Sequence, residues 1–152
     1  MRKSLSDIFD VRLIKLDFDG KTKELALTEL IDSISALHPG CDRTELFTAL
    51  MEREKKMSTG IGNGIAIPHA GCKGIADMGG AIGVSKQGID YGALDNKPVY
   101  IVFLFATSEK TDENHLRILS LLFKLAMSRE FALIKDANNA EEIHAILSRV
   151  HL

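Results

Sequence analysis

Residues 98–107 read PVYIVFLFAT, the longest near-continuous apolar run in the chain. The run is too short for a helix and is rich in β-branched and aromatic residues, so it predicts a strand. Because polar residues do not alternate with apolar ones, both faces of this strand are expected to be buried, as at the centre of a sheet. The run is also far shorter than the roughly 20 residues of a membrane-spanning helix, so no membrane insertion is predicted.

The segments before this run predict one strand and two helices. Residues 11–17 alternate apolar and charged side chains, a pattern typical of a half-buried strand. Residues 22–37 repeat leucine and isoleucine at helical spacing, and a proline-glycine pair follows them. Asp42, with Glu45 three positions later, forms a variant of the capping box and starts a second helix that ends near Lys56.

Residues 57–84 are rich in glycine, isoleucine and alanine, which predicts short strands joined by tight glycine turns. After the apolar run, residues 111–113 (Thr-Asp-Glu) supply an N-cap and first-turn acids for a helix. Two shorter helices are expected over 129–137 and 140–150. Together these elements predict an α/β fold with a mixed β-sheet sandwiched between helices on both faces, and residues 1–152 are expected to form a single domain.

The composition excludes several classes of protein. Hydrophobic residues make up 45% of the chain and charged residues 26%, which is typical of a globular protein and not of a disordered one. The net charge is −2, and the lysine and arginine clusters are interleaved with or flanked by acidic residues. Binding to nucleic acid requires a concentrated basic face, so nucleic acid is not an expected partner.

The two cysteines, Cys41 and Cys72, are interpreted through the expected compartment. The basic start of the chain is not followed by the apolar core of a signal peptide, so a cytoplasmic location is predicted. Because the cytoplasm is reducing, we expect two free thiols that the fold does not need.

The most unusual stretch is STGIGNGIAIPH, residues 58–69. Its glycines are followed by residues that predict a strand, whereas a nucleotide-binding loop requires a helix at that point, so nucleotide binding is rejected. Pro68 fixes its own φ and favours an extended Ile67, which places His69 on a stiff backbone at the end of a short strand. A rigid mount suits a nucleophile. The alternative is a histidine in a polar loop with no chemical role.

Two further residues are candidates for the same site. His115 lies near the start of a predicted helix and shares a face with Leu119 and Leu122, so it should lean towards the core as a neutral hydrogen-bond donor. Its alternative is a partly buried structural histidine. Arg53 lies near the end of the second helix, and its alternative is a solvated charge paired with a neighbouring acid.

A metal site is the weaker hypothesis for these residues. His69 and Cys72, with Cys41 or His115, would provide one His-x-x-Cys without a second closely spaced pair, which is a weak pattern. No hydrolase motif is present in the sequence. We therefore expect no metal and no cofactor.

Taken together, Arg53-Glu54, the stretch 58–69 and His115-Leu116 resemble the fructose/mannitol-type enzyme IIA family of the phosphoenolpyruvate-dependent phosphotransferase system. The likeness runs from about the second helix to the last. The unbroken run to Pro68-His69 and residues 93–99 most resemble the nitrogen-regulatory IIA branch. Residues 70–74 (Ala-Gly-Cys-Lys-Gly) depart from the family pattern beside the expected docking surface.

This resemblance implies that His69 accepts a phosphoryl group, that His115 stabilises it and that Arg53 assists its transfer. The implied donor is an HPr-like phosphocarrier protein. The acceptor is either a set of regulatory target proteins or, alternatively, the cysteine of a IIB domain in sugar uptake. A third possibility, a binding module without phosphoryl chemistry, is disfavoured because all three residue types are present.

Overall fold

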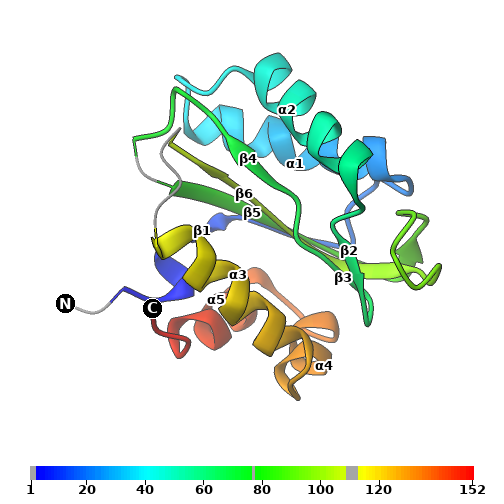
Figure 1. Cartoon of the computed structure of the whole chain (residues 1–152). Coiled ribbons are helices and arrows are strands. Elements are labelled where there is room, and N and C mark those ends of the chain that lie inside the picture. The colour runs from blue at the N-terminus through cyan, green and yellow to red at the C-terminus, as the bar shows by residue number, and fades with distance from the viewer. Residues whose placement is uncertain (1–2, 77, 109–112) are drawn as a thin grey trace.

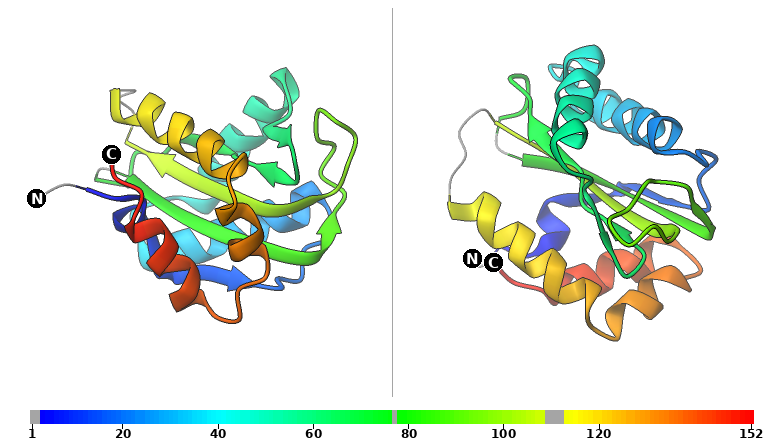
Figure 2. Two further views of the ribbon diagram at one scale, coloured as in Figure 1. Left: turned by 90° about the horizontal axis from the view of Figure 1, so that it is seen from below. Right: turned by 45° about the vertical axis from the view of Figure 1, so that its right-hand side comes forward.

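The computed structural model describes residues 3–76, 78–108 and 113–152, without the side chains of residues 113 and 114. Within these residues the chain forms one mixed sheet between two helical layers (Figures 1 and 2). One layer contains α1 (Lys23–Leu37) and α2 (Arg43–Lys56), and the other contains α3 (Glu113–Ala126), α4 (Glu130–Lys135) and α5 (Ala140–Ser148). The predicted α/β fold with helices on both faces is confirmed.

The described strands are β1 (Phe9–Leu16), β2 (Gly60–Gly62), β3 (Ile65–Ala66), β4 (His69–Gly71), β5 (Met78–Ile89) and β6 (Val99–Thr107). Their order is β1-β5-β6-β3-β2, and β4 also pairs with β6. A short 3-10 helix, Leu5–Asp7, precedes β1 and packs with α5. Ser4 pairs with His151, so the first and last described segments lie side by side.

The run at residues 98–107 is the central strand β6, and its two faces are buried as predicted. Phe103 and Phe105 pack among the residues of α3, α4 and α5, whereas Val102 and Leu104 pack beneath α1 and α2. All four side chains are fully buried. Since full burial of one such side chain stabilises a fold by about 1.5–3 kcal/mol, this single strand contributes to both cores at once.

The helix starts read from the sequence are also confirmed. Thr22 caps α1 by accepting from the N–H of Leu25, and Asp42 caps α2 by accepting from the N–H of Glu45 at 2.9 Å. The predicted cap of α3 over residues 111–113 falls largely outside the described residues. None of the described helices has the length and apolar character needed to cross a bilayer.

The glycine-rich stretch is only partly as predicted. Short strands form at β2, β3 and β4, but β5 is a strand of 12 residues. Two of its glycines lie against aromatic rings: a Cβ on Gly80 would lie 2.5 Å from the Phe9 ring, and one on Gly83 would lie 2.7 Å from the Phe18 ring. These glycines accommodate buried aromatics instead of making turns, which local sequence does not show.

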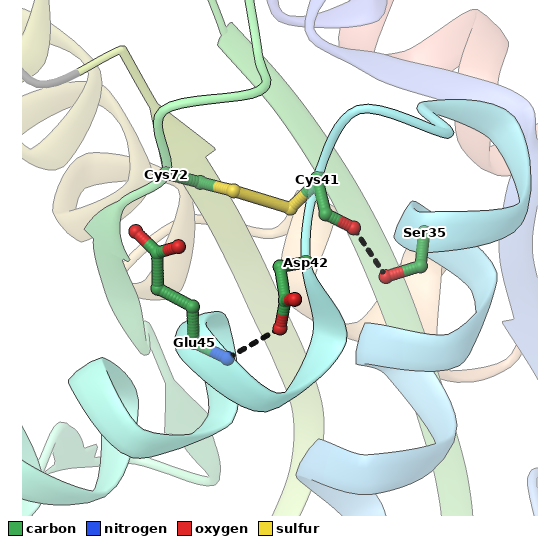
Figure 3. Close-up of a disulfide and its surroundings, with 5 residues drawn as sticks. All are labelled: Ser35, Cys41, Asp42, Glu45 and Cys72. Carbon is green, nitrogen blue, oxygen red and sulfur yellow. Dashed lines mark hydrogen bonds between the residues drawn. A yellow bond between two sulfur atoms is a disulfide. The ribbon is translucent and has the colours of Figure 1, made fainter.

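The expectation of free thiols is wrong, because Cys41 and Cys72 form a disulfide (Figure 3). Cys41 lies between α1 and α2, and Cys72 directly follows β4. Ser35 of α1 donates to the Cys41 carbonyl at 3.2 Å, and Asp42 caps α2 immediately afterwards (Figure 3). The sequence argument rested on compartment alone, whereas packing of the α1–α2 connection against the end of β4 brings the Cα atoms within 6.2 Å.

We predict that the disulfide stabilises the oxidised protein by about 3–4 kcal/mol, the chain-entropy value for its sequence separation of 31 residues. Denaturant unfolding of the wild-type protein should show this loss when a reductant is added. The double variant Cys41→Ala/Cys72→Ala should be insensitive to the reductant. Equal free energies of unfolding for fully oxidised and fully reduced wild type would contradict the prediction.

Candidate active site

His69 is mounted on a strand that runs along the edge of β6. β3 and β4 lie end to end, with Ile65 opposite Ile101 and His69 opposite Phe105. Pro68 lies between the two strands, where it has no N–H to donate, but its carbonyl accepts from the N–H of Phe105 at 3.1 Å. His69 is thus the first residue of β4, and the alternative of a polar loop is wrong.

The His69 ring is held from two sides. It stacks on the Phe105 ring with a centroid distance of 5.2 Å and an interplanar angle of 11°. Its Nδ1 lies 2.8 Å from the carbonyl oxygen of Ile67. Since a carbonyl can only accept, Nδ1 carries the proton of the neutral ring, and Nε2 is left with its lone pair. Nε2 is therefore the ring nitrogen that has a lone pair available.

His115 lies beside His69, although the two residues are 46 positions apart in sequence. It follows shortly after α3 begins at Glu113, and its half-buried ring lies 5.0 Å from the His69 ring at an angle of 67°. The Phe105 ring is 5.5 Å from His115, so the three rings form one cluster. The predicted lean of His115 towards the core is confirmed, and the nearby positive end of the α3 dipole favours an anion.

Arg53 reaches the same region from the last turn of α2. Its Nη1 donates to the carbonyl of Met57 at 2.8 Å, which fixes the guanidinium against the turn that leads into β2. The positive charge of Arg53 acts electrostatically on His69. The three residues singled out in the sequence are therefore gathered at one place from α2, β4 and α3.

The surroundings lower the pKa of His69. Burial of the ring is the largest cause, the Ile67 carbonyl opposes it, and the fields of His115 and Arg53 add to the decrease. A lower pKa keeps the imidazole neutral at physiological pH, which is the form that has a lone pair to share. The site is therefore set up for nucleophilic attack by nitrogen on an electrophile that carries negative charge.

Sequence reasoning missed a buried polar cluster next to this site. It consists of Lys23, Glu54, Thr59 and Tyr91. The sequence predicted no separate role for Glu54, which neighbours Arg53, or for Thr59, which lies in the glycine-rich stretch. Lys23 and Tyr91 lie far from both in sequence and carry no motif, so no pattern could have found them. Phe105, the platform under His69, was predicted only as core.

The metal hypothesis finds no support in the geometry. The sulfur that it needs, that of Cys72, is joined to Cys41 in the disulfide, so neither cysteine is a thiolate ligand. In the part of the chain that the structure describes, histidine, cysteine and acidic side chains form no group of three suited to a metal ion.

Comparison with known proteins decides the family. The sequence profile described as "Phosphoenolpyruvate-dependent sugar phosphotransferase system, EIIA 2" matches residues 7–150. The chain belongs to this family. The predicted resemblance, and with it the phosphotransferase character of the chain, is confirmed.

Relatives of two kinds match this EIIA chain. It is 35% identical to the fructose-specific EIIABC component of Bacillus subtilis over 97% of its own length, but spans only 23% of that protein. It is 34% identical to a nitrogen regulatory protein of Klebsiella oxytoca, with 95% of this chain and 90% of that protein covered. The crystal structure of IIA-Ntr from Neisseria meningitidis superposes with a TM-score of 0.85 at 29% identity, covering 93% and 97% of the two chains.

We predict that His69 titrates below the ordinary histidine range in NMR spectra of its imidazole. Because the folded state binds this proton less well than the unfolded chain does, stability should fall as pH drops below about 6.5. His69→Gln should flatten this loss of stability between neutral and mildly acidic pH. An ordinary or raised pKa for the His69 imidazole would show that the site is more solvated than its geometry indicates.

Proposed function

We propose that this EIIA chain is a phosphohistidine carrier that accepts a phosphoryl group on Nε2 of His69 from an HPr-like phosphoprotein. The observation that carries the proposal is the contact between the His69 and His115 rings, with Nδ1 of His69 held by the Ile67 carbonyl and Arg53 near enough for its charge to lower the pKa of His69. The chain is proposed to act as a single domain over residues 1–152 in the cytoplasm, without a cofactor.

The proposed chemistry is a transfer between two imidazoles. The lone pair on Nε2 of His69 forms a new P–N bond while the P–N bond of the donor phosphohistidine breaks, and that electron pair leaves with the donor imidazole. The proton on Nδ1 of His69 stays in place throughout. Because the transition state is loose and spreads its charge over the phosphoryl oxygens, the protein mainly positions groups and stabilises charge.

His115 and Arg53 are proposed to stabilise the phosphoryl oxygens. His115 is close enough to His69 to present an N–H, and Arg53 is already fixed by Met57 so that little of its freedom remains to be lost on transfer. The start of α3 adds a favourable dipole.

Two downstream roles remain, and we favour the one in which phosphorylation changes which regulatory target proteins the chain binds. Relatives of both kinds are matched over most of their length: 96% for the fructose-specific EIIA component of Haloferax volcanii and 90% for the nitrogen regulatory protein of Klebsiella oxytoca. The preference rests on residues 58–69 and 93–99, which most resemble the nitrogen-regulatory branch. The alternative is a sugar-specific IIA that donates to a IIB cysteine. A phosphoryl group adds roughly −1.5 to −2 charge and three acceptor oxygens, so it can expel one partner and recruit another.

Exposed apolar side chains next to the site are suited to such a switch in partner. Met57 and Leu116 are 59% and 65% exposed. The Met57 carbonyl accepts from Arg53, and Leu116 directly follows His115. In the glycine-rich stretch, Ile61 is half-buried, but Ile65 is fully buried in the core and cannot contribute to this surface. A partner that packs on Met57 and Leu116 would have to bury the new charge.

Incubation with phosphoenolpyruvate, enzyme I and HPr should add one phosphoryl group to the wild-type protein, located on His69 by phosphosite mapping. The product should be acid-labile and stable to mild base, as a phosphoramidate is. His69→Gln should accept none while it retains its fold by circular dichroism. A phosphorylated His69→Gln protein, or full retention of the label after acid, would refute the assignment.

His115 should act as a donor and not as an acceptor of the phosphoryl group. His115→Gln keeps an N–H that can face the phosphoryl oxygens and should retain measurable phosphorylation, whereas His115→Leu should lose roughly 10-fold more. Initial rates of phosphorylation with a fixed amount of phospho-HPr measure the difference. Identical rates for the two variants would rule out this role.

The regulatory and sugar-transport alternatives differ in the fate of the phosphoryl group on His69. The phosphorylated protein should donate poorly to a fructose- or mannitol-type IIB domain, and His69→Gln should bind a different set of partners from the phosphorylated wild type. Rapid transfer to the IIB domain with no phosphorylation-dependent partners would favour the sugar-transport alternative.

A further inference from the structure

Glu54 is a buried carboxylate at the end of α2, next to Arg53. Its side chain is only 3% exposed, and it pairs with Lys23 at 2.9 Å, whose side chain is 17% exposed. Moving a carboxylate out of water costs several kcal/mol unless it is paired and hydrogen-bonded. A carboxylate kept at such a position needs a physical reason.

The hydrogen bonds of Glu54 come from three other parts of the chain. The N–H of Thr59 donates to both carboxylate oxygens, at 3.3 and 3.2 Å, and the Thr59 hydroxyl also bonds to Oε1. The Tyr91 hydroxyl lies 3.2 Å from Oε1 and 2.8 Å from the Thr59 hydroxyl. Lys23 also lies 4.8 Å from the centroid of the Tyr91 ring. Glu54 thus connects the start of α1, the end of α2, the start of β2 and the segment after β5.

The Tyr91 hydroxyl keeps its proton and so remains a hydrogen-bond donor. Its burial, and then the nearby negative charge of Glu54, raise the pKa of the Tyr91 hydroxyl. The hydroxyl therefore keeps its proton and can bond to an acceptor in the cluster at any physiological pH.

A chain of backbone hydrogen bonds runs from this cluster to His69. Glu54 holds Thr59, and the carbonyl of Thr59 accepts from the N–H of Ile67 at 2.9 Å. The carbonyl of Ile67 in turn accepts from Nδ1 of His69. Fixing Thr59 therefore fixes the residue that orients the His69 ring and determines its tautomer.

The same turn also holds Arg53. Between Glu54 and Thr59 the chain passes Met57, whose carbonyl accepts from Arg53 Nη1. A shift of this turn would move the anchor of the guanidinium and the anchor of the imidazole together. The Glu54 carboxylate is thus connected, through the same turn, to both Arg53 and His69.

We propose that Glu54 is a positioning residue, which anchors the turn from Met57 to Thr59 so that Arg53 and His69 converge on one phosphoryl group. The proposal rests on the proposed function of His69. Lys23, Thr59 and Tyr91 hold Glu54 in turn, and none of these four residues needs to touch the phosphoryl group. The cluster explains why a costly buried charge lies directly behind the site.

The test compares phosphoryl transfer from phospho-HPr in Glu54→Gln and wild type. Glu54→Gln keeps the shape of the side chain but replaces one acceptor oxygen with a donor amide. The rate constant at saturating phospho-HPr should fall roughly 10- to 100-fold, as expected when reacting groups are misplaced, with KM changed less than about twofold. An unchanged rate constant in folded Glu54→Gln would overturn the proposal.

Variants that remove a single hydroxyl from the cluster test the proposal even if Glu54→Gln does not fold. Tyr91→Phe removes one hydroxyl from the cluster and should slow transfer, whereas the matched control Tyr100→Phe, on β6, should not. Thr59→Val should also slow transfer, and Thr59→Ser, which keeps the hydroxyl, should restore it. If Tyr91→Phe and Tyr100→Phe are equally active, and Thr59→Val equals Thr59→Ser, the cluster has no positioning role.

NMR spectra of the imidazoles separate this proposal from the proposed function. Wild type should show nuclear Overhauser contacts between the His69 and His115 rings, and Glu54→Gln should weaken them. The pKa of His69 should also be lower in Glu54→Gln than in the wild type, because the negative charge of Glu54 raises the pKa of His69 in the wild type. If wild type is not phosphorylated on His69, the proposed function fails, while unchanged ring contacts in Glu54→Gln would independently refute the positioning role.

Discussion

Backbone pairing along β6 is the constraint on which the rest of this structure depends. On one edge β6 pairs with the long strand β5, and on the other it pairs with β3 and β4 in succession. Its side chains alternate between the two cores, so the same strand holds both helical layers. Any displacement of β6 would therefore disturb the sheet, both cores and the mount of His69 at once.

The candidate site is built on this rigid framework. Phe105 is fully buried and belongs to the core, yet its ring is also the surface on which His69 stacks. Pro68 interrupts the ladder between β3 and β4, and the carbonyl of Ile67, just before it, binds Nδ1. The core thus supplies both orientation and tautomer, and partial burial keeps the ring neutral.

Polar groups behind the site are expensive, and their arrangement shows how that cost is offset. Glu54 is paired with Lys23 and accepts hydrogen bonds from Thr59 and Tyr91. This ion pair and these hydrogen bonds offset the cost of burying its charge. The disulfide restrains another border of the same region, where Cys72 leaves β4 and Cys41 precedes α2 (Figure 3). The disulfide therefore holds the start of α2, and the cluster around Glu54 holds its end, relative to the strand that carries His69.

The sequence by itself determined the elements whose causes are local, namely the apolar run of β6, the helical spacing of α1 and the cap at Asp42. The resemblance carried by residues 58–69 also identified the family, while the roles of its three site residues remain proposals. Only the tertiary structure decided the contacts between distant segments: the β5 glycines make room for two phenylalanines, the cysteines meet across 31 positions, and Lys23 and Tyr91 complete the cluster around Glu54. Local sequence propensity cannot predict such contacts, because their free energy arises only when the sheet and both helical layers have packed.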